Sequence, residues 1–157
     1  MSVIEILIVI FIIVVALIAL SGLTTFSLKV SSSIKESALA DNLARETIEA
    51  VRNFRDGTAW AADGLGTLSV DSSHPHYPRL DTSTSPAKWT LPEGTETTSG
   101  FTRKVVFEKV SRNPANKNIE AVYNPANDDP NTRKAVITVS WKSKNFEVIV
   151  YFTNWKL

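Results

Sequence analysis

The chain begins with a long run of apolar positions. No residue between Ile6 and Leu28 is charged, and most positions from Val3 to Leu20 hold Val, Ile, Leu, Phe or Ala. As a helix rising about 1.5 Å per residue, this run is long enough to cross the roughly 30 Å hydrocarbon core of a bilayer. Because apolar residues occupy every side of such a helix, it must lie in lipid or inside an apolar assembly. The simplest interpretation of residues 1–28 is a membrane anchor.

The pattern changes after the first cation, Lys29. Charged residues become frequent, while apolar residues recur at near-helical spacing at Ile34, Leu39, Leu43, Ile48, Val51 and Phe54. Gly57 supplies a stop, because Gly is common just past a helix end. The sequence therefore predicts one helix from about Ser2 to Arg55. In its amphipathic part, residues 29–56, one side needs a partner within the same chain.

The stretch 57–100 is rich in Gly, Pro, Ser, Thr and Asp, and it holds four of the chain's seven prolines. No long helix fits there, so we expect a connecting loop with short strands at Leu65–Val70 and Lys88–Leu91. Three large aromatic side chains in this loop are expected to fix it by packing, or alternatively to form an exposed surface that binds other surfaces or glycans: Trp60, Tyr77 and Trp89.

Residues 101–157 carry the strand signals. The predicted strands are Phe101–Arg112, Ile119–Tyr123, Ala135–Lys142 and Phe146–Thr153. The link Ser143-Lys144-Asn145 predicts an antiparallel hairpin of the last two strands. Alternation between residues 136 and 141 leaves one apolar face, which suits the amphipathic helix. The predicted fold class is α+β, with the second half of a long N-terminal helix packed against a C-terminal antiparallel sheet.

Glu5 is the one charged residue within the apolar run. A lone carboxylate in apolar surroundings costs several kcal/mol unless it is paired or neutralised. The first 28 residues contain no Lys, Arg or His, so the nearest cation is the α-amino group of Met1. That amine belongs either to the same chain or to an identical chain shifted along the helix axis. The second arrangement would turn the anchor into an assembly device.

This N-terminus resembles the mature N-terminus of the type IV pilin family, which includes the pseudopilins of type II secretion and competence. The resemblance covers residues 1–24 and rests on Met1, Ser2, Glu5 and the unbroken apolar run. It implies the pilin ladle fold, removal of a basic leader by a prepilin peptidase, N-methylation of Met1, and pairing of Glu5 with a neighbouring subunit's amine. The chain is then expected to be the mature form, because no positively charged region precedes the apolar run.

Two features depart from the family pattern. Many members carry Gly near position 14 and Pro at position 22, where the helix loosens in the filament, whereas this chain has Val14 and Gly22. Its weakest helix-forming residues still lie there, and we expect any loosening at Ser21, Gly22, Thr24 and Thr25. Alternatively, Gly22 only permits close helix packing. The chain also has no cysteine, so the C-terminal disulfide loop of many pilins is excluded.

Composition limits the other functions. A length of 157 residues allows one modest domain beyond the anchor, and a net charge of +1 gives no overall footprint for nucleic acid. No Gly-rich phosphate loop, nucleophile elbow or Ser/His/Asp arrangement stands out, so we expect neither an enzyme nor a cofactor. A DNA-binding patch stays open as an alternative to a mixed solvated surface, through Arg103, Lys104, Lys109, Arg112, Lys117, Arg133, Lys134, Lys142 and Lys144.

Two segments have residues that bind metals in other proteins. His74 and His76 flank a proline and could bind a metal together with Asp71 or Asp81. A second group offers the oxygens that calcium prefers, from Asn127, Asp128, Asp129 and Asn131. A solvated loop and ordinary turn chemistry explain both segments without a metal, and we prefer that interpretation.

The combined expectation is a structural subunit of a type IV pilus that serves surface attachment, motility or DNA uptake. Alternatives are a minor pilin, a pseudopilin, or a single-pass anchored binding protein that never polymerises. The resemblance implies a homopolymer, with a prepilin peptidase, an assembly ATPase and platform proteins as partners. It also implies a location in the inner or cytoplasmic membrane before assembly and in an extracellular pilus afterwards.

Overall fold

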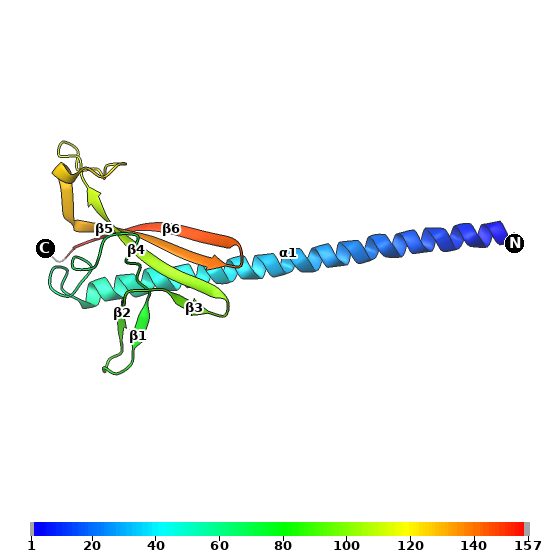
Figure 1. The fold of residues 1–157 in the computed structure, drawn as a ribbon, viewed down its shortest axis with the longest axis horizontal. Coiled ribbons are helices and arrows are strands. Elements are labelled where there is room, and N and C mark those ends of the chain that lie inside the picture. Colours follow the sequence, from blue (N-terminus) through cyan, green and yellow to red (C-terminus); the bar gives the residue numbers. More distant parts are fainter. Residues whose placement is uncertain (1, 156–157) are drawn as a thin grey trace. The chain divides into compact units, whose positions relative to one another are not determined.

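A computed structural model describes residues 2–155 (Figure 1). Its elements in chain order are helix α1 (Val3–Gly57), strands β1 (Arg79–Asp81), β2 (Lys88–Thr90), β3 (Glu96–Thr98) and β4 (Phe101–Ser111), the 3-10 helix η1 (Pro125–Asn127), and strands β5 (Asp128–Trp141) and β6 (Lys144–Thr153). The chain divides into two compact units, one ending at Leu39 and one beginning at Ala40. The predicted α+β class is confirmed.

Helix α1 is one element, as the hydrophobic pattern predicts, and it ends two residues later than expected. None of residues 2–39 is buried. From Ala40 onward, a buried side appears, formed by Ala40, Ala44, Thr47, Ala50 and Val51. Residues three and four apart share a side of a helix, so these residues form one stripe. Most are small, which lets the helix backbone approach the neighbouring sheet closely.

The main sheet has four antiparallel strands in the order β3-β4-β5-β6, and β1 pairs with β2 in a separate two-stranded sheet. Across the main sheet, Val105 pairs with Ile137, and Ile137 pairs with Val148. These side chains lie on the face that joins the helix stripe in one apolar core; its sheet members include Phe101, Val105, Phe107, Ala135, Ile137, Val139, Trp141 and Phe152. The apolar face predicted from the alternation of residues 136–141 is therefore confirmed, because Ile137, Val139 and Trp141 lie in this core.

One buried cation links the helix to this sheet face. Arg103, on β4, lies among the core residues and is almost fully buried. Its Nε donates to Glu96 on β3 at 2.5 Å, and its Nη1 lies 3.1 Å from Glu46 on α1 without the alignment of a hydrogen bond. The pair of carboxylates compensates for the charge of the guanidinium, which would otherwise be costly to bury.

Two predicted strands are wrong. Residues 119–123 run irregularly, with one bridge between Ile119 and Arg112. Residues 65–70 form turns instead of a strand. The turn brings Gly66 against Trp60, whose carbonyl oxygen accepts from the Gly66 N–H at 2.9 Å. A Cβ at Gly66 would lie 2.5 Å from that oxygen, so this close approach requires glycine.

The predicted hairpin is confirmed, but three of its boundaries are wrong: the start and the end of β5 and the start of β6. The loop has two residues, Lys142 and Ser143, because Trp141 pairs directly with Lys144. Strand β5 begins at Asp128, seven residues before the predicted start at 135. Pro130 is tolerated there because pairing with β6 begins only at Thr132, so no ladder hydrogen bond is needed from its nitrogen.

Candidate assembly site at the N-terminal helix

The first turn of α1 is a capping box formed by Ser2 and Glu5. The backbone N–H of Ser2 donates to Glu5 Oε2 at 3.0 Å, and the Ser2 hydroxyl accepts from the N–H of Ile4 at 3.4 Å. The carboxylate and the hydroxyl thus satisfy two donors that a helix start otherwise leaves open. From the sequence, only amines were expected as partners of Glu5. The spacing Ser-x-x-Glu was the signal that could have revealed this second partner.

Met1 lies outside the described residues. Its N-methylation and its pairing with Glu5 are therefore predictions that this structure does not test. The geometry of residues 2–5 shows that the carboxylate of Glu5 already accepts one hydrogen bond and can accept another. The described residues supply a donor to Oε2 of Glu5, and a carboxylate can accept several hydrogen bonds across its two oxygens.

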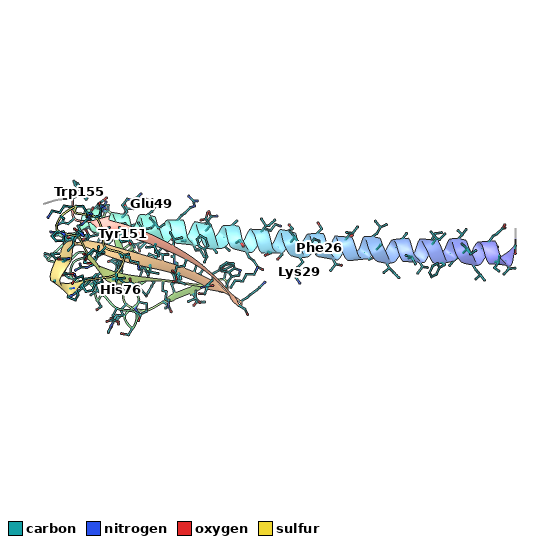
Figure 2. All side chains as sticks on the ribbon, turned by 90° about the horizontal axis from the view of Figure 1, so that it is seen from above. Phe26, Lys29, Glu49, His76, Tyr151 and Trp155 are labelled. Carbon is teal, nitrogen blue, oxygen red and sulfur yellow. The ribbon has the colours of Figure 1, made fainter. Side chains whose placement is uncertain are left out.

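The apolar surface that surrounds this carboxylate is fully accessible in the single chain. Every large apolar side chain between Val3 and Leu28 is exposed, and the exposed fraction of Phe11 reaches 68%. Figure 2 shows side chains projecting from α1 on both edges of the ribbon, near Phe26 and Lys29 as elsewhere along the helix. By length and composition, α1 is the one described helix that could cross a membrane. Such a large apolar surface marks a contact with lipid or protein.

The predicted loosening segment is a regular helix in the single chain. The hydroxyls of Ser21, Thr24 and Thr25 each donate to the carbonyl four residues earlier, at 2.9 to 3.0 Å. A Cβ on Gly22 would meet nothing within 4 Å. Bonds of this kind satisfy hydroxyls in apolar surroundings and slightly weaken the helix. Loosening concerns the assembled state and stays a prediction.

The two histidines have separate environments. His74 is partly exposed, and its Nδ1 lies 2.8 Å from Asp71 Oδ2, which raises the pKa of His74. Hydrogen bonds from Ser73 and His74 lower the pKa of Asp71 to about 2. His76 is buried beside Phe107, and burial lowers its pKa. Among residues 2–155, no group of three or more His, Cys, Asp or Glu side chains is arranged to hold a metal ion.

The candidate calcium ligands are engaged with the protein itself. Asp129 accepts from Arg112 Nε at 2.5 Å and from the Thr132 hydroxyl at 2.6 Å. Burial alone would raise the pKa of Asp129, but these hydrogen bonds outweigh it and hold the pKa below its ordinary value. Asp128 accepts from the Tyr123 hydroxyl at 3.0 Å, Asn127 donates to Glu120 at 2.9 Å, and the carbonyl of Asn131 accepts from Asn154 at 2.8 Å. Each group thus has a role in the turn.

Several other candidate residues are also held within the fold. Trp60 donates to the carbonyl of Pro130 at 2.9 Å, and the guanidinium of Arg133 lies 6.0 Å from the centre of its ring system. Tyr77 and Trp89 are half-buried. Among the basic residues considered for DNA binding, Arg103 and Arg133 are buried, and Arg112 and Lys134 are ion-paired.

Comparison with protein-family models, with curated proteins and with solved structures finds no match to this chain. The architecture is compatible with a pilin-like protein, because a long helix that is apolar at its N-terminal end packs its later residues on an antiparallel sheet. The length and composition of α1 are likewise compatible with membrane anchoring.

Proposed function

We propose that the chain is a non-enzymatic structural subunit of a type IV pilus. In this proposal, each copy waits in the inner or cytoplasmic membrane and then joins an extracellular helical filament whose core is built from residues 1–28. A prepilin peptidase, an assembly ATPase and platform proteins supply processing and energy. Attachment, twitching motility or DNA uptake would be the task of the filament.

One observation carries the proposal: a carboxylate at Glu5 lies at the start of an apolar helix surface that the chain itself leaves uncovered. Lipid could cover that surface, but a plain anchor has no use for a charge. A helical polymer has a use for both features. The apolar surface packs against equivalent helices, and Glu5 sets their stagger by pairing with the amine of a neighbouring Met1.

The capping box changes the free energy that we expect for pairing Glu5 with the amine of a neighbouring chain. In a membrane, helix association gains little from the hydrophobic effect, because lipid is as apolar as leucine, so packing and polar pairing decide the geometry. Glu5 has a partner in the Ser2 N–H before assembly. Its free-chain penalty is thus smaller than that of an isolated carboxylate, and the gain on pairing comes from the charge of the second donor.

The same hydrogen bond favours one alternative. If the cap of Ser2 is the whole purpose of Glu5, the chain is a single-pass anchored binding protein that does not polymerise. A minor pilin or pseudopilin is a third possibility, in which the helix chemistry is the same and only the number of copies differs.

Two substitutions separate these functions. Glu5→Gln keeps an oxygen that can accept from the Ser2 N–H, because Gln also forms capping boxes, but it removes the charge. Glu5→Ala removes both. In cells that produce the assembly machinery, the proposal predicts that both variants insert into the membrane and that both yield few or no sheared surface filaments.

The anchored-protein alternative predicts a different result. Glu5→Gln would then behave as the unchanged chain does, and no filaments would be recovered from either. Normal filaments from Glu5→Gln would show that the charge has no part in assembly. Mass spectrometry of the N-terminus from the same preparations tests methylation of Met1.

A further inference from the structure

The strap formed by residues 71–77 is joined to the main sheet at His76. The backbone N–H of His76 donates to the carbonyl of Val105 on β4 at 2.8 Å, and the N–H of Val105 donates to the carbonyl of His76 at 2.7 Å. These two bonds form an isolated bridge on the edge of β4 that faces away from β5. Strand β3 pairs with the same edge only from Phe101 to Arg103. The strap therefore extends the sheet by one residue beyond β3.

On its other side, the strap pairs with residues 92–94. The N–H of Gly94 donates to the carbonyl of Pro75 at 2.7 Å, so these two segments are held to each other independently of β4. Just beyond the pair, Pro78 and Leu91 are buried, and Leu91 belongs to the apolar core. The strap and residues 92–94 could thus move away from β4 together, while Pro78 and Leu91 hold the rest of the hairpin in place.

The ring of His76 (Figure 2) is buried where the strap meets β4. The residue has an exposed fraction of 4%, and its ring lies 5.7 Å from the ring of Phe107 in an edge-on arrangement. Nδ1 is shielded from solvent and has no hydrogen-bond partner among residues 2–155. A neutral ring costs less here than an imidazolium, which would bury a charge and an N–H donor that has no acceptor.

Two charged groups act on this ring among residues 2–155. Burial has the largest effect and lowers the pKa of His76, and the charge of His74 on the strap lowers it further. The charge of Glu93, which lies directly across the strand pair, and a backbone hydrogen bond at His74 raise this pKa by less. From β4, the ring faces the neutral side chain of Phe107. The Glu93 side chain is 56% exposed, so it attracts a charged ring toward solvent.

We propose that protonation of His76 releases the strap from β4 by a local opening, while the rest of the sheet stays folded. The ring and both bonds of the bridge belong to one residue, so a charged ring that moves toward solvent and Glu93 draws the strap away from Val105. The open fraction should be constant well above pH 6.5 and should rise as pH falls through 6.5, the ordinary value that applies once the strap is open. This inference does not depend on the proposed function.

The test measures amide hydrogen exchange at two adjacent residues of β4, by NMR of the full chain in lipid nanodiscs with EDTA present. The N–H of Val105 reports on the bridge, whereas that of Val106 points to β5, because successive residues of a strand alternate. After correction for the intrinsic exchange rate, the protection of Val105 should fall by about fivefold or more between pH 8 and pH 5, and that of Val106 by less than about twofold.

Two variants assign the effect to one ring. His76→Phe removes the titrating group and should abolish the fall at Val105. His74→Asn is the matched control, because it removes the neighbouring histidine and leaves His76 in place, so the fall should persist. The ring signals of His76 should titrate with the same midpoint as the exchange at Val105.

The proposal is overturned if the protection of Val105 falls no more than that of Val106, because the sheet then either opens as a whole or does not respond. It is also overturned if the fall persists in a folded His76→Phe chain or disappears in His74→Asn. If His76→Phe does not fold, the comparison of Val105 with Val106 in the unchanged chain decides.

Discussion

Residues 3–39 and residues 40–57 belong to one helix, but the first part exposes its apolar side chains and the second part buries several of them. In the first part, every large apolar residue up to Leu28 is exposed. In the second part, Ala44 and Val51 are buried in a core shared with Phe107 and Ile137 of the sheet. The first part depends on an outside partner, and the second carries its partner in the same chain. Apolar residues therefore need helical spacing only in the second part, where one side of the helix packs on the sheet.

The largest expected difference in stability is between substitutions of a buried and an exposed phenylalanine. Phe107 is fully buried, so Phe107→Ala should lower the free energy of unfolding by about 3–5 kcal/mol through lost burial and a cavity. Phe11→Ala should leave that free energy unchanged, because Phe11 has no neighbour in a folded core. Denaturant unfolding in nanodiscs, followed by tryptophan fluorescence, measures both. Equal losses would show that the N-terminal part of the helix contributes to the folded core as Phe107 of β4 does.

A smaller effect is expected at the buried cation that joins the helix to the sheet. Arg103→Ala removes the partner of Glu46 and Glu96 and should cost about 2–3 kcal/mol, toward the low end for a broken buried pair because both carboxylates can turn to water. Arg103→Met keeps much of the side-chain packing and should cost less. Lys104→Ala, on the opposite face of β4, is the control and should change stability by at most about 0.5 kcal/mol. A similar loss in both positions would contradict the role given to Arg103.

The smallest effect is expected from pH, through two histidines with opposite behaviour. Burial lowers the pKa of His76, so its contribution to stability is present above its ordinary value of 6.5 and declines as pH falls through 6.5. Asp71 raises the pKa of His74, so that contribution is complete below 6.5 and declines as pH rises through the folded value. The groups that act on His76 are Glu93 and His74.

These opposite signs are measured by urea unfolding between pH 5 and pH 8. His76→Phe should reduce the loss of stability on acidification. His74→Asn should lower the free energy of unfolding more at pH 5 than at pH 8. The difference should be small, because the His74–Asp71 pair is partly exposed to solvent. If the effects of the two variants on stability change in the same direction between pH 5 and pH 8, the assignment of opposite roles is incorrect.

The sequence predicted the elements whose pattern is long and regular. Helix α1 and the β5–β6 hairpin follow from periodicity over many residues. Residues 119–123 show why short apolar runs are less informative. In this segment one bridge, from Ile119 to Arg112, joins the backbone to a neighbour, and Val122 is 81% exposed. Pairing partners depend on residues distant in sequence, which local composition does not describe.

The candidate sites were predicted unevenly for the same reason. Ser2 and Glu5 lie three residues apart, so their bond could have been read from spacing alone. Arg103 was considered a surface cation because nothing near it in sequence indicates that Glu46 faces it from a helix 57 residues earlier.

The bond between Ser2 and Glu5 has one more consequence. A carboxylate that must break its bond to one partner before it binds another passes through a state in which it has neither. In the proposed filament, Glu5 would avoid that state, because the Ser2 N–H binds only Oε2 of its carboxylate and moves with the same helix. A chain could thus change neighbours repeatedly while the first turn of its helix stays capped. A filament held by this contact could disassemble and reassemble from the same chains.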